Sequence, residues 1–163
     1  MTVRVNDPAR YVVALDLDGT LLRDDKTVSD FTVETLERVS AAGVNFFFTT
    51  GRRQRIAVPV LERFDFPSWL IMNNGTVALS RHGGDRLFTH YMPEQMVRDA
   101  IRCLADFERP PVLLIDPDGA PHDIVMSPLH LDVPVYREYA AAHEGYVIVA
   151  DVLEEHRSEE RRV

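Results

Sequence analysis

Residues 11–21 read YVVALDLDGTL, and this stretch decides the fold. Its first part, Tyr11–Leu17, is a nearly continuous apolar run with β-branched side chains, which predicts a short parallel strand buried on both faces. Asp16 and Asp18 stand at the carboxyl end of that strand, where open α/β sheets bind ligands. Because the two residues are two apart in an extended chain, their carboxylates project from one face, and a divalent cation with a phosphate oxygen offsets their repulsion. Gly19 then lets the backbone turn and approach a ligand closely.

Strand-like and helix-like segments alternate after this stretch. Two helices are predicted over about residues 29–42 and 53–64, and two further buried strands at residues 44–49 (VNFFFT) and 69–72 (WLIM). Ser29 is the expected N-cap of the first helix and Gly43 its stop, while Pro59 makes the second helix start late or kink. This βαβαβ order predicts a parallel α/β sheet with right-handed crossovers.

The alternation ends near residue 78. The remaining segments are predicted as a hairpin over 76–80 and 86–91, a helix over 93–107, strands over 112–115 and 124–126, a helix over 135–143 and a strand over 146–150. We therefore expect an α/β core over residues 1–78, followed by an α+β domain over residues 79–163.

Composition excludes several classes of function. The 163 residues carry 18 Lys and Arg against 26 Asp and Glu, a net charge of −8, which offers no overall attraction for nucleic acid or an anionic membrane. Any bound phosphate must therefore be held by local groups. No apolar run approaches a membrane span, and no signal peptide is recognised, so we expect a cytoplasmic location. The basic residues are seventeen arginines and one lysine, Lys26.

Three short motifs follow the three predicted parallel strands in order: Asp16–Leu21 (DLDGTL), Thr50–Arg52 (TGR) and Asn73–Gly75 (NNG). In this arrangement the chain resembles the haloacid dehalogenase (HAD) superfamily of phosphohydrolases, and within it the Cof-like branch, whose cap domain is inserted after the third core strand. The resemblance implies a HAD-like Rossmannoid parallel sheet, incomplete in this chain, with an inserted α+β cap.

The resemblance also implies a function and a set of site residues. It implies a Mg²⁺-dependent phosphatase that acts on small phosphomonoesters, with sugar phosphates as the first guess. Asp16 is then the nucleophile that forms an aspartyl-phosphate, and Asp18 is the acid and base for the leaving group and the water. Mg²⁺ is held by the Asp16 carboxylate and the Asp18 backbone carbonyl. The resemblance implies phosphate binding by Thr50 and Gly51, with Gly19, Arg52 and Asn74 beside the substrate.

Parts of the family pattern are missing. The family has a lysine or arginine after the cap, then an acidic Gly-Asp motif that completes the Mg²⁺ site, and neither is visible. Lys26 lies in the loop that flanks the expected site entrance, which is not where the family places its phosphate-binding lysine. Three interpretations stay open: the N-terminal part of a longer Cof-like phosphatase, a degenerate protein that binds phosphate or a partner without turnover, and a phosphomutase.

The first strand also leads to an expectation about the stability of the chain. In the family this strand is paired on both sides, and strands after the cap complete the sheet. A chain that stops at Val163 is expected to leave YVVALDL on an open edge, which favours aggregation. We therefore expect this chain alone to be poorly stable, or the edge to be covered.

Other candidate residues have simpler interpretations. Arg52, Arg53 and Arg55 are expected to point into solvent, although they hint at an anionic ligand. Cys103 is expected to be a small core residue on an apolar helix face. Asp116–Gly119 (DPDG) is expected to be a turn, and the charged tail from Glu154 a solvated helix end. The six histidines show no spacing that suits zinc.

Overall fold

A computed structural model describes residues 11–82, 84–104, 107, 111–115 and 121–150. The chain divides into two compact units, Met1–Tyr91 and Met92–Val163. The expected boundary after residue 78 therefore differs from the observed division, because the hairpin that follows residue 75 belongs to the sheet of the first unit.

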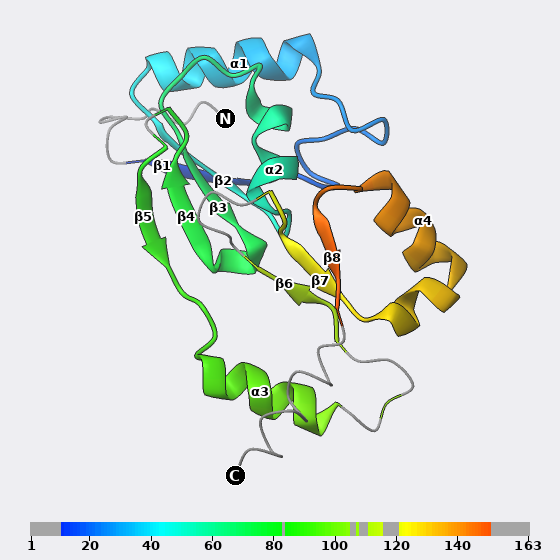
Figure 1. The fold of residues 1–163 in the computed structure, drawn as a ribbon. Helices are drawn as coiled ribbons and strands as arrows, with labels where there is room; N and C mark the ends of the chain where they lie inside the picture. The colour runs from blue at the N-terminus through cyan, green and yellow to red at the C-terminus, as the bar shows by residue number, and fades with distance from the viewer. Residues whose placement is uncertain (1–10, 83, 105–106, 108–110, 116–120, 151–163) are drawn as a thin grey trace. The chain divides into compact units, whose positions relative to one another are not determined.

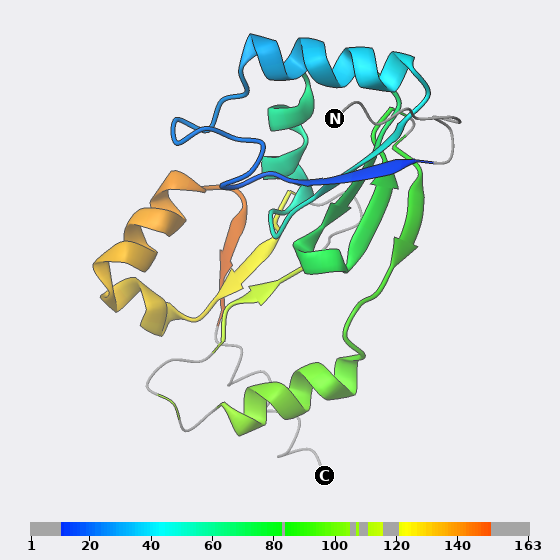
Figure 2. The same ribbon diagram turned by 180° about the vertical axis from the view of Figure 1, so that it is seen from behind.

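The first unit is built on a five-stranded sheet in the order β1-β2-β3-β4-β5. The strands are β1 (Val12–Asp16), β2 (Asn45–Thr49), β3 (Trp69–Met72), β4 (Val77–Ser80) and β5 (Arg86–Thr89). The first three are parallel, as the alternation predicts, and β4 and β5 add to β3 as antiparallel neighbours. Figure 2 shows this hairpin continuing the sheet beyond β3.

Helix α1 (Asp30–Ala41) connects β1 to β2, with the predicted cap and stop (Figure 1). The Ser29 hydroxyl accepts a hydrogen bond from the Thr32 amide at 3.1 Å, and Gly43 has the positive φ that ends such helices. The sequence places Val33, Leu36 and Val39 at three-residue spacing, and all three pack into the core. The helix is thus fixed to the sheet by one apolar stripe.

The connection from β2 to β3 contains a shorter helix than expected. Helix α2 covers only Gln54–Ala57, and a 3-10 turn, η2 (Pro59–Leu61), follows it. Pro59 has no amide hydrogen to continue the helical ladder, which accounts for the break. Ala57 and Leu61 nevertheless reach the same core as β2.

The core of the first unit is dominated by aromatic side chains. Phe46 and Phe48 of β2 are fully buried, and Phe48 stacks on Phe64 with ring centroids 5.2 Å apart. On the other face of β2, Phe47 stacks on Trp69 of β3 at 4.9 Å. One face of β2 is thus fully buried and the other half-buried, which explains why aromatic side chains occupy both faces of this strand.

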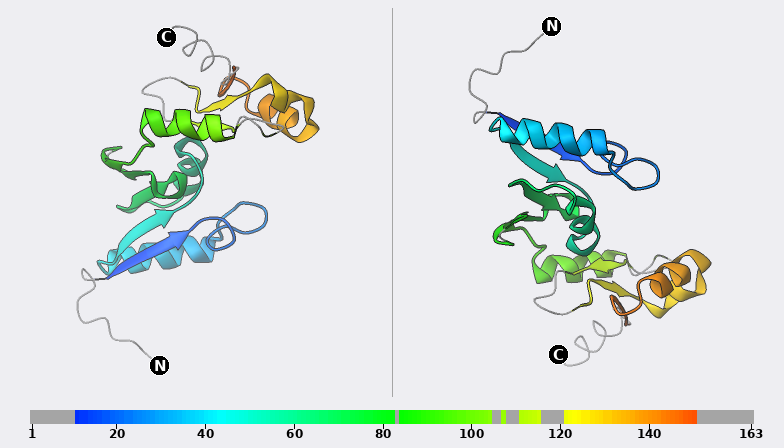
Figure 3. Two further views of the ribbon diagram at one scale, coloured as in Figure 1. Left: turned by 90° about the horizontal axis from the view of Figure 1, so that it is seen from below. Right: turned by 90° about the horizontal axis from the view of Figure 1, so that it is seen from above.

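The expectation that the first strand is buried on both faces is wrong. β1 lies at the margin of the sheet, and among the described residues only β2 pairs with it (Figure 3). Val13 and Leu15 pack against the core, whereas the alternate residues Val12, Ala14 and Asp16 are exposed. The predicted open edge is therefore present in the structure.

The second unit contains a helix and a small three-stranded sheet in the order β6-β7-β8. Its elements are α3 (Glu94–Cys103), β6 (Leu113–Leu114), β7 (Ile124–Met126), η4 (Pro128–Asp132), α4 (Pro134–Ala142) and β8 (Val147–Val149). The α+β content is as predicted. Cys103 is exposed, so its expected place in a core is wrong: the buried residue of α3 is Ile101. The DPDG segment and the charged tail lie outside the described residues.

None of the described helices combines the length and the apolar character needed to cross a bilayer.

The open edge of β1 predicts self-association. Val12 is 60% exposed on this edge, so Val12→Lys is expected to weaken edge-to-edge pairing of this chain, because a charged side chain disfavours strand addition. Stability should change by less than about 0.5 kcal/mol, as is usual at an exposed position. Sedimentation velocity over a range of protein concentrations measures the association, and thermal unfolding measures the stability.

Phe31→Lys is the matched control, because Phe31 is 78% exposed but lies on helix α1 and not on the edge strand. Equal association of both variants and the unaltered chain, or an unaltered chain that stays monomeric and unfolds cooperatively, contradicts the prediction.

Candidate active site

Parallel pairing brings three residues into one row at the carboxyl ends of the strands. Asp16 of β1 is in register with Thr49 of β2, which is in register with Ile71 of β3. These three residues line a cavity of about 320 Å³ in the first unit, together with Thr50, Gly51, Asn74 and Gly75. The Asp16 carboxylate thus stands at an open cavity whose other walls come from the two neighbouring strand ends.

The chain leaves β1 through a tight loop. The amides of Leu21 and Leu22 donate to the carbonyls of Asp16 and Leu17 at 3.1 and 2.8 Å, and both leucines are buried. Gly19 adopts a φ of +77°, which L side chains rarely adopt. The leucines anchor the loop in the core, so that the polar residues before them remain at the surface.

The loop after β2 is held against the turn after β3. The Thr50 amide donates to the Ile71 carbonyl at 2.9 Å, the Asn73 amide to the Arg52 carbonyl at 3.1 Å and the Asn74 amide to the Thr50 carbonyl at 3.3 Å. The Thr50 hydroxyl is buried and accepts the Arg52 amide at 3.1 Å, so its own proton is available to a ligand. The second and third motifs are therefore joined by backbone hydrogen bonds into one wall of the cavity.

The turn after β3 is conformationally unusual. Asn73, Asn74 and Gly75 have φ values of 49°, 55° and 95°, so three successive residues are left-handed. Asparagine and glycine are the residues that tolerate this region best. The Asn73 side-chain oxygen is also buried with no hydrogen-bond partner among the described residues. Strain of this kind is often kept at functional sites.

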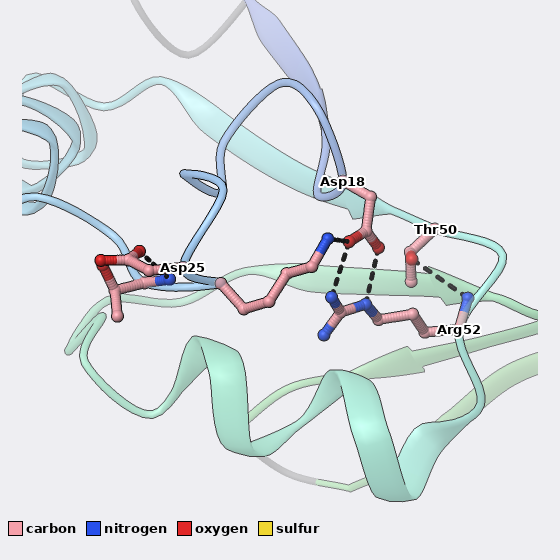
Figure 4. A network of polar contacts seen from close by, with 6 residues as sticks. Asp18, Asp25, Thr50 and Arg52 are labelled. Atoms are coloured by element: carbon pink, nitrogen blue, oxygen red, sulfur yellow. Dashed lines mark hydrogen bonds and ion pairs between the residues drawn. The ribbon is translucent and has the colours of Figure 1, made fainter. Parts of the chain in front are cut away.

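Asp18 is engaged by two cations beside the cavity (Figure 4). Arg52 binds its carboxylate in a bidentate manner, with Nε 2.6 Å from Oδ2 and Nη2 2.6 Å from Oδ1. Lys26 Nζ lies 3.1 Å from the same Oδ1. The Arg52 hydrogen bonds are the largest cause, and Lys26 a smaller one, that lower the pKa of Asp18 to about 2. Asp18 is therefore ionised at neutral pH in this structure.

Two expectations about the arginines need correction. Arg52 is largely covered, with 17% of its side chain exposed, and Arg53 is buried, so neither points into solvent. Arg52 turns back from the loop after β2 toward Asp18 because a carboxylate and a guanidinium form two parallel hydrogen bonds. The anion that Arg52 contacts in this structure is therefore the carboxylate of Asp18, a residue of the chain itself.

The predicted site residues fall into two neighbouring groups. Asp16, Thr50, Gly51 and Asn74 line the cavity. Asp18, which interacts with Arg52, and Gly19 belong to the loop beside it. Gly75 of the third motif completes the cavity with Thr49 and Ile71, two strand residues that carried no chemical signal in the sequence. Strand register alone reveals them, and register depends on the pairing of strands distant in sequence.

The oxygen donors near Asp16 suit a hard cation such as Mg²⁺. The Asp16 carboxylate is exposed, and the Asp18 backbone carbonyl belongs to the adjoining loop. Mg²⁺ commonly binds through one or two protein oxygens and keeps several waters. Within the described residues no group of three or more His, Cys, Asp or Glu side chains is placed to hold a metal. The Asp18 carboxylate is engaged by Arg52 and Lys26, so of the two carboxylates of the first motif it is the exposed one of Asp16 that lines the cavity.

Comparison with known proteins agrees with this geometry. The family profile of haloacid dehalogenase-like hydrolases matches residues 13–125. The chain is 33% identical over 96 residues to the 5-amino-6-(5-phospho-D-ribitylamino)uracil phosphatase of Bacillus subtilis, covering 59% of this chain and 34% of that protein. It is 31% identical over 91 residues to an HMP-PP phosphatase of Yersinia pestis, covering 56% and 33%. The chain thus spans about a third of these curated relatives.

Solved structures show the same fold. A HAD-superfamily phosphatase from Bacteroides thetaiotaomicron superposes with a TM-score of 0.69 at 21% identity, over 98% of this chain and 55% of that one. A protein from Thermotoga maritima gives a TM-score of 0.64 at 23% identity, over 89% and 51%. The fold of this chain therefore corresponds to about half of each of these proteins.

The contact between Gly51 and Asn74 predicts a specific effect on stability. A Cβ at residue 51 would lie 2.8 Å from Asn74 Oδ1. Gly51→Ala is therefore expected to lower the free energy of unfolding by no more than about 1 kcal/mol, because the colliding atom is the end of an exposed side chain that can move aside. Gly51 does not adopt a positive φ, so backbone strain is not the cause. Denaturant unfolding measures the change.

Asn74→Ala should remove most of this penalty when it is combined with Gly51→Ala, because it deletes the colliding amide. A double-mutant cycle measures their coupling, which should account for most of the penalty of Gly51→Ala. Additive effects of the two substitutions contradict the proposed contact.

The pairing of Asp18 with Arg52 predicts a dependence on pH. The pKa of Asp18 is about 2 in the folded chain and about 3.9 in an unfolded one. The ionised carboxylate therefore stabilises the fold above about pH 4, and this stabilisation is lost as the pH falls toward 2. Arg52→Met should raise the folded pKa of Asp18 by about one unit, since it removes the largest cause of the shift. Carbon-13 NMR titration of the carboxyl group measures this.

Arg38→Met is the control for the loss of one positive charge from the same unit, because Arg38 lies in α1. An Asp18 pKa that is unchanged by Arg52→Met, or raised equally by both variants, contradicts the pairing.

Proposed function

Because the chain belongs to the haloacid dehalogenase-like hydrolase family, we propose that it hydrolyses small phosphomonoesters in a Mg²⁺-dependent reaction through a phosphorylated Asp16. One observation carries the proposal: Asp16 and the donors of the loop after β2 line the same cavity. The Asp16 carboxylate supplies a nucleophile, and the opposite wall supplies hydrogen bonds to phosphate.

The phosphate cradle is formed by the loop after β2. The Thr50 hydroxyl can donate to a phosphoryl oxygen, because it accepts only the Arg52 amide and keeps its own proton. Gly51 is exposed at the cavity, where its lack of a side chain lets the backbone approach a ligand. Preorganised donors of this kind stabilise the charge that develops on phosphoryl oxygens.

The reaction has two displacements. An Asp16 carboxylate oxygen attacks phosphorus, the bond to the leaving oxygen breaks, and that oxygen takes a proton from Asp18. Water then attacks phosphorus, the bond to Asp16 breaks, and Asp18 receives the proton of the water. Bound Mg²⁺ would supply charge neutralisation at the phosphoryl oxygens, held by the Asp16 carboxylate and the Asp18 backbone carbonyl.

The ionised state of Asp18 sets a condition on this mechanism. Asp18 can donate a proton only after its carboxylate has gained one, and Arg52 and Lys26 oppose that gain. A substrate phosphate is a stronger competitor for a guanidinium than a carboxylate of single charge. We infer that substrate draws these cations away from Asp18, which raises its pKa and prepares it as the acid.

The substrate class is inferred from the relatives. Two relatives bear the names of phosphatases for a phosphoribitylamino-uracil and for HMP-PP, and we propose a small phosphorylated metabolite for this chain, with sugar phosphates as the first guess. A phosphomutase would share the first displacement and is separated by analysis of the products.

A second candidate function is phosphate binding without turnover. The observation that favours it is the bidentate Arg52 contact, which holds the acid and base group in its charged form. Under this alternative the cavity binds phosphate, but Asp16 is not phosphorylated.

Release of phosphate from p-nitrophenyl phosphate tests the proposal. The full chain is expected to release phosphate with Mg²⁺ and not with excess chelator. Asp16→Asn should reduce the rate by at least about 100-fold, because an amide is not a nucleophile here. Asp24→Asn is the matched control, since Asp24 is an exposed carboxylate of the neighbouring loop. Equal rates for Asp16→Asn and Asp24→Asn contradict the nucleophile, and a folded chain that binds phosphate without releasing any supports the second candidate.

A further inference from the structure

We propose that Lys26 is a phosphate-binding residue of this site, acting with Arg52 on the oxygens of the bound phosphate. The proposal deepens the proposed function and rests on it for the location of the phosphate. It assigns a role to the single lysine of the chain, which lies in the loop that flanks the expected site entrance and not where the family places its phosphate-binding lysine.

The backbone at Lys26 is the first argument. Its φ is +63°, and the other described residues with positive φ are asparagines or glycines. Lysine has neither the short polar side chain nor the missing Cβ that eases this conformation. A residue kept in an unfavourable region by its surroundings points to a function of its side chain.

The loop around Lys26 is built to hold that conformation. The Arg23 amide donates to the Thr27 carbonyl at 2.9 Å, and the Lys26 amide donates to the Arg23 carbonyl at 2.9 Å. The Asp25 carboxylate accepts both the amide and the hydroxyl of Thr27, at 3.0 and 2.6 Å. This closed turn directs the Lys26 ammonium to Asp18, eight residues back along the chain.

The arrangement of charge is the second argument. Lys26 Nζ and Arg52 Nη2 both donate to the same oxygen, Asp18 Oδ1, at 3.1 and 2.6 Å. Two cations converge on one carboxylate, so the cluster carries a surplus positive charge within a chain of net charge −8. Their mutual repulsion is relieved by a further anion. A phosphate dianion has the charge and enough oxygens to accept from both cations at once.

The competing interpretation is a surface ion pair with no role in binding. Lys26 is 61% exposed at its side chain and Asp18 43%, and exposed pairs of this kind contribute little to stability. A lysine that served only the fold would thus have little reason to keep a left-handed backbone. The two interpretations differ in whether phosphate binding depends on the ammonium.

Phosphate binding by three variants of the full chain decides between them. Lys26→Asn removes the charge and suits the left-handed backbone, Lys26→Arg keeps the charge, and Arg23→Asn removes the same charge from the same loop. Titration calorimetry with inorganic phosphate and Mg²⁺ gives the dissociation constants, and thermal unfolding reports the fold.

We expect Lys26→Asn to weaken phosphate binding about fivefold or more, as for the loss of an exposed charged hydrogen bond. Its unfolding temperature should be unchanged or higher, because asparagine tolerates the local φ. Lys26→Arg and Arg23→Asn should bind within about twofold of the unaltered chain, since each keeps a cation at the position of Lys26. Weaker phosphate binding by Lys26→Asn, together with an unfolding temperature that is not lowered, excludes a purely structural role for Lys26.

Equal phosphate affinity for Lys26→Asn and Arg23→Asn overturns the proposal, as does an unaltered chain that binds no phosphate. The proposed hydrolysis can fail separately. If the chain binds phosphate through Lys26 but releases none from p-nitrophenyl phosphate, the assignment of Lys26 stands and the proposed phosphatase activity is contradicted.

Discussion

The parallel register of β1, β2 and β3 is the constraint on which the candidate site depends. It sets Asp16 beside Thr49 and Thr49 beside Ile71, so that three strand ends open into one cavity. A shift of one residue in β1 would turn the Asp16 side chain to the opposite face of the sheet. The buried aromatic residues of β2 fix this register, because Phe46 and Phe48 fit the core only when they face the helices.

Local electrostatics compensate for an unfavourable overall charge. The chain is acidic, yet Arg52 and Lys26 meet at Asp18 and hold its carboxylate ionised. Under the proposed mechanism, the same contact keeps Asp18 in the wrong protonation state for the first displacement. The proposed mechanism thereby links phosphate binding to proton transfer, because a phosphate that binds the two cations would also free the Asp18 carboxylate.

The sequence predicts most of the first unit and the identity of its chemical groups. The β1, β2 and β3 strands, the Ser29 cap and the motif positions after each strand are evident from local pattern, because each is encoded within a few residues. The partners of Asp18 were not predicted. Arg52 is 34 residues from Asp18 in the chain, and Lys26 is eight residues from it. The direction in which such long side chains point depends on tertiary structure. The prediction that Cys103 is a core residue was wrong for a related reason, since an apolar helix face predicts burial only where another element covers it.

The open edge of β1 joins the stability of the sheet to the chemistry of the site. Its backbone groups on that side lack a partner among the described residues, and its last residue is Asp16. Any strand that pairs with this edge in the parallel sense would bring its own carboxyl end beside Asp16, where ligands of open α/β sheets bind. Residues delivered there would face the Asp16 carboxylate from the side opposite Thr49. Coverage of the edge therefore stabilises β1 and adds chemical groups to the cavity at the same time.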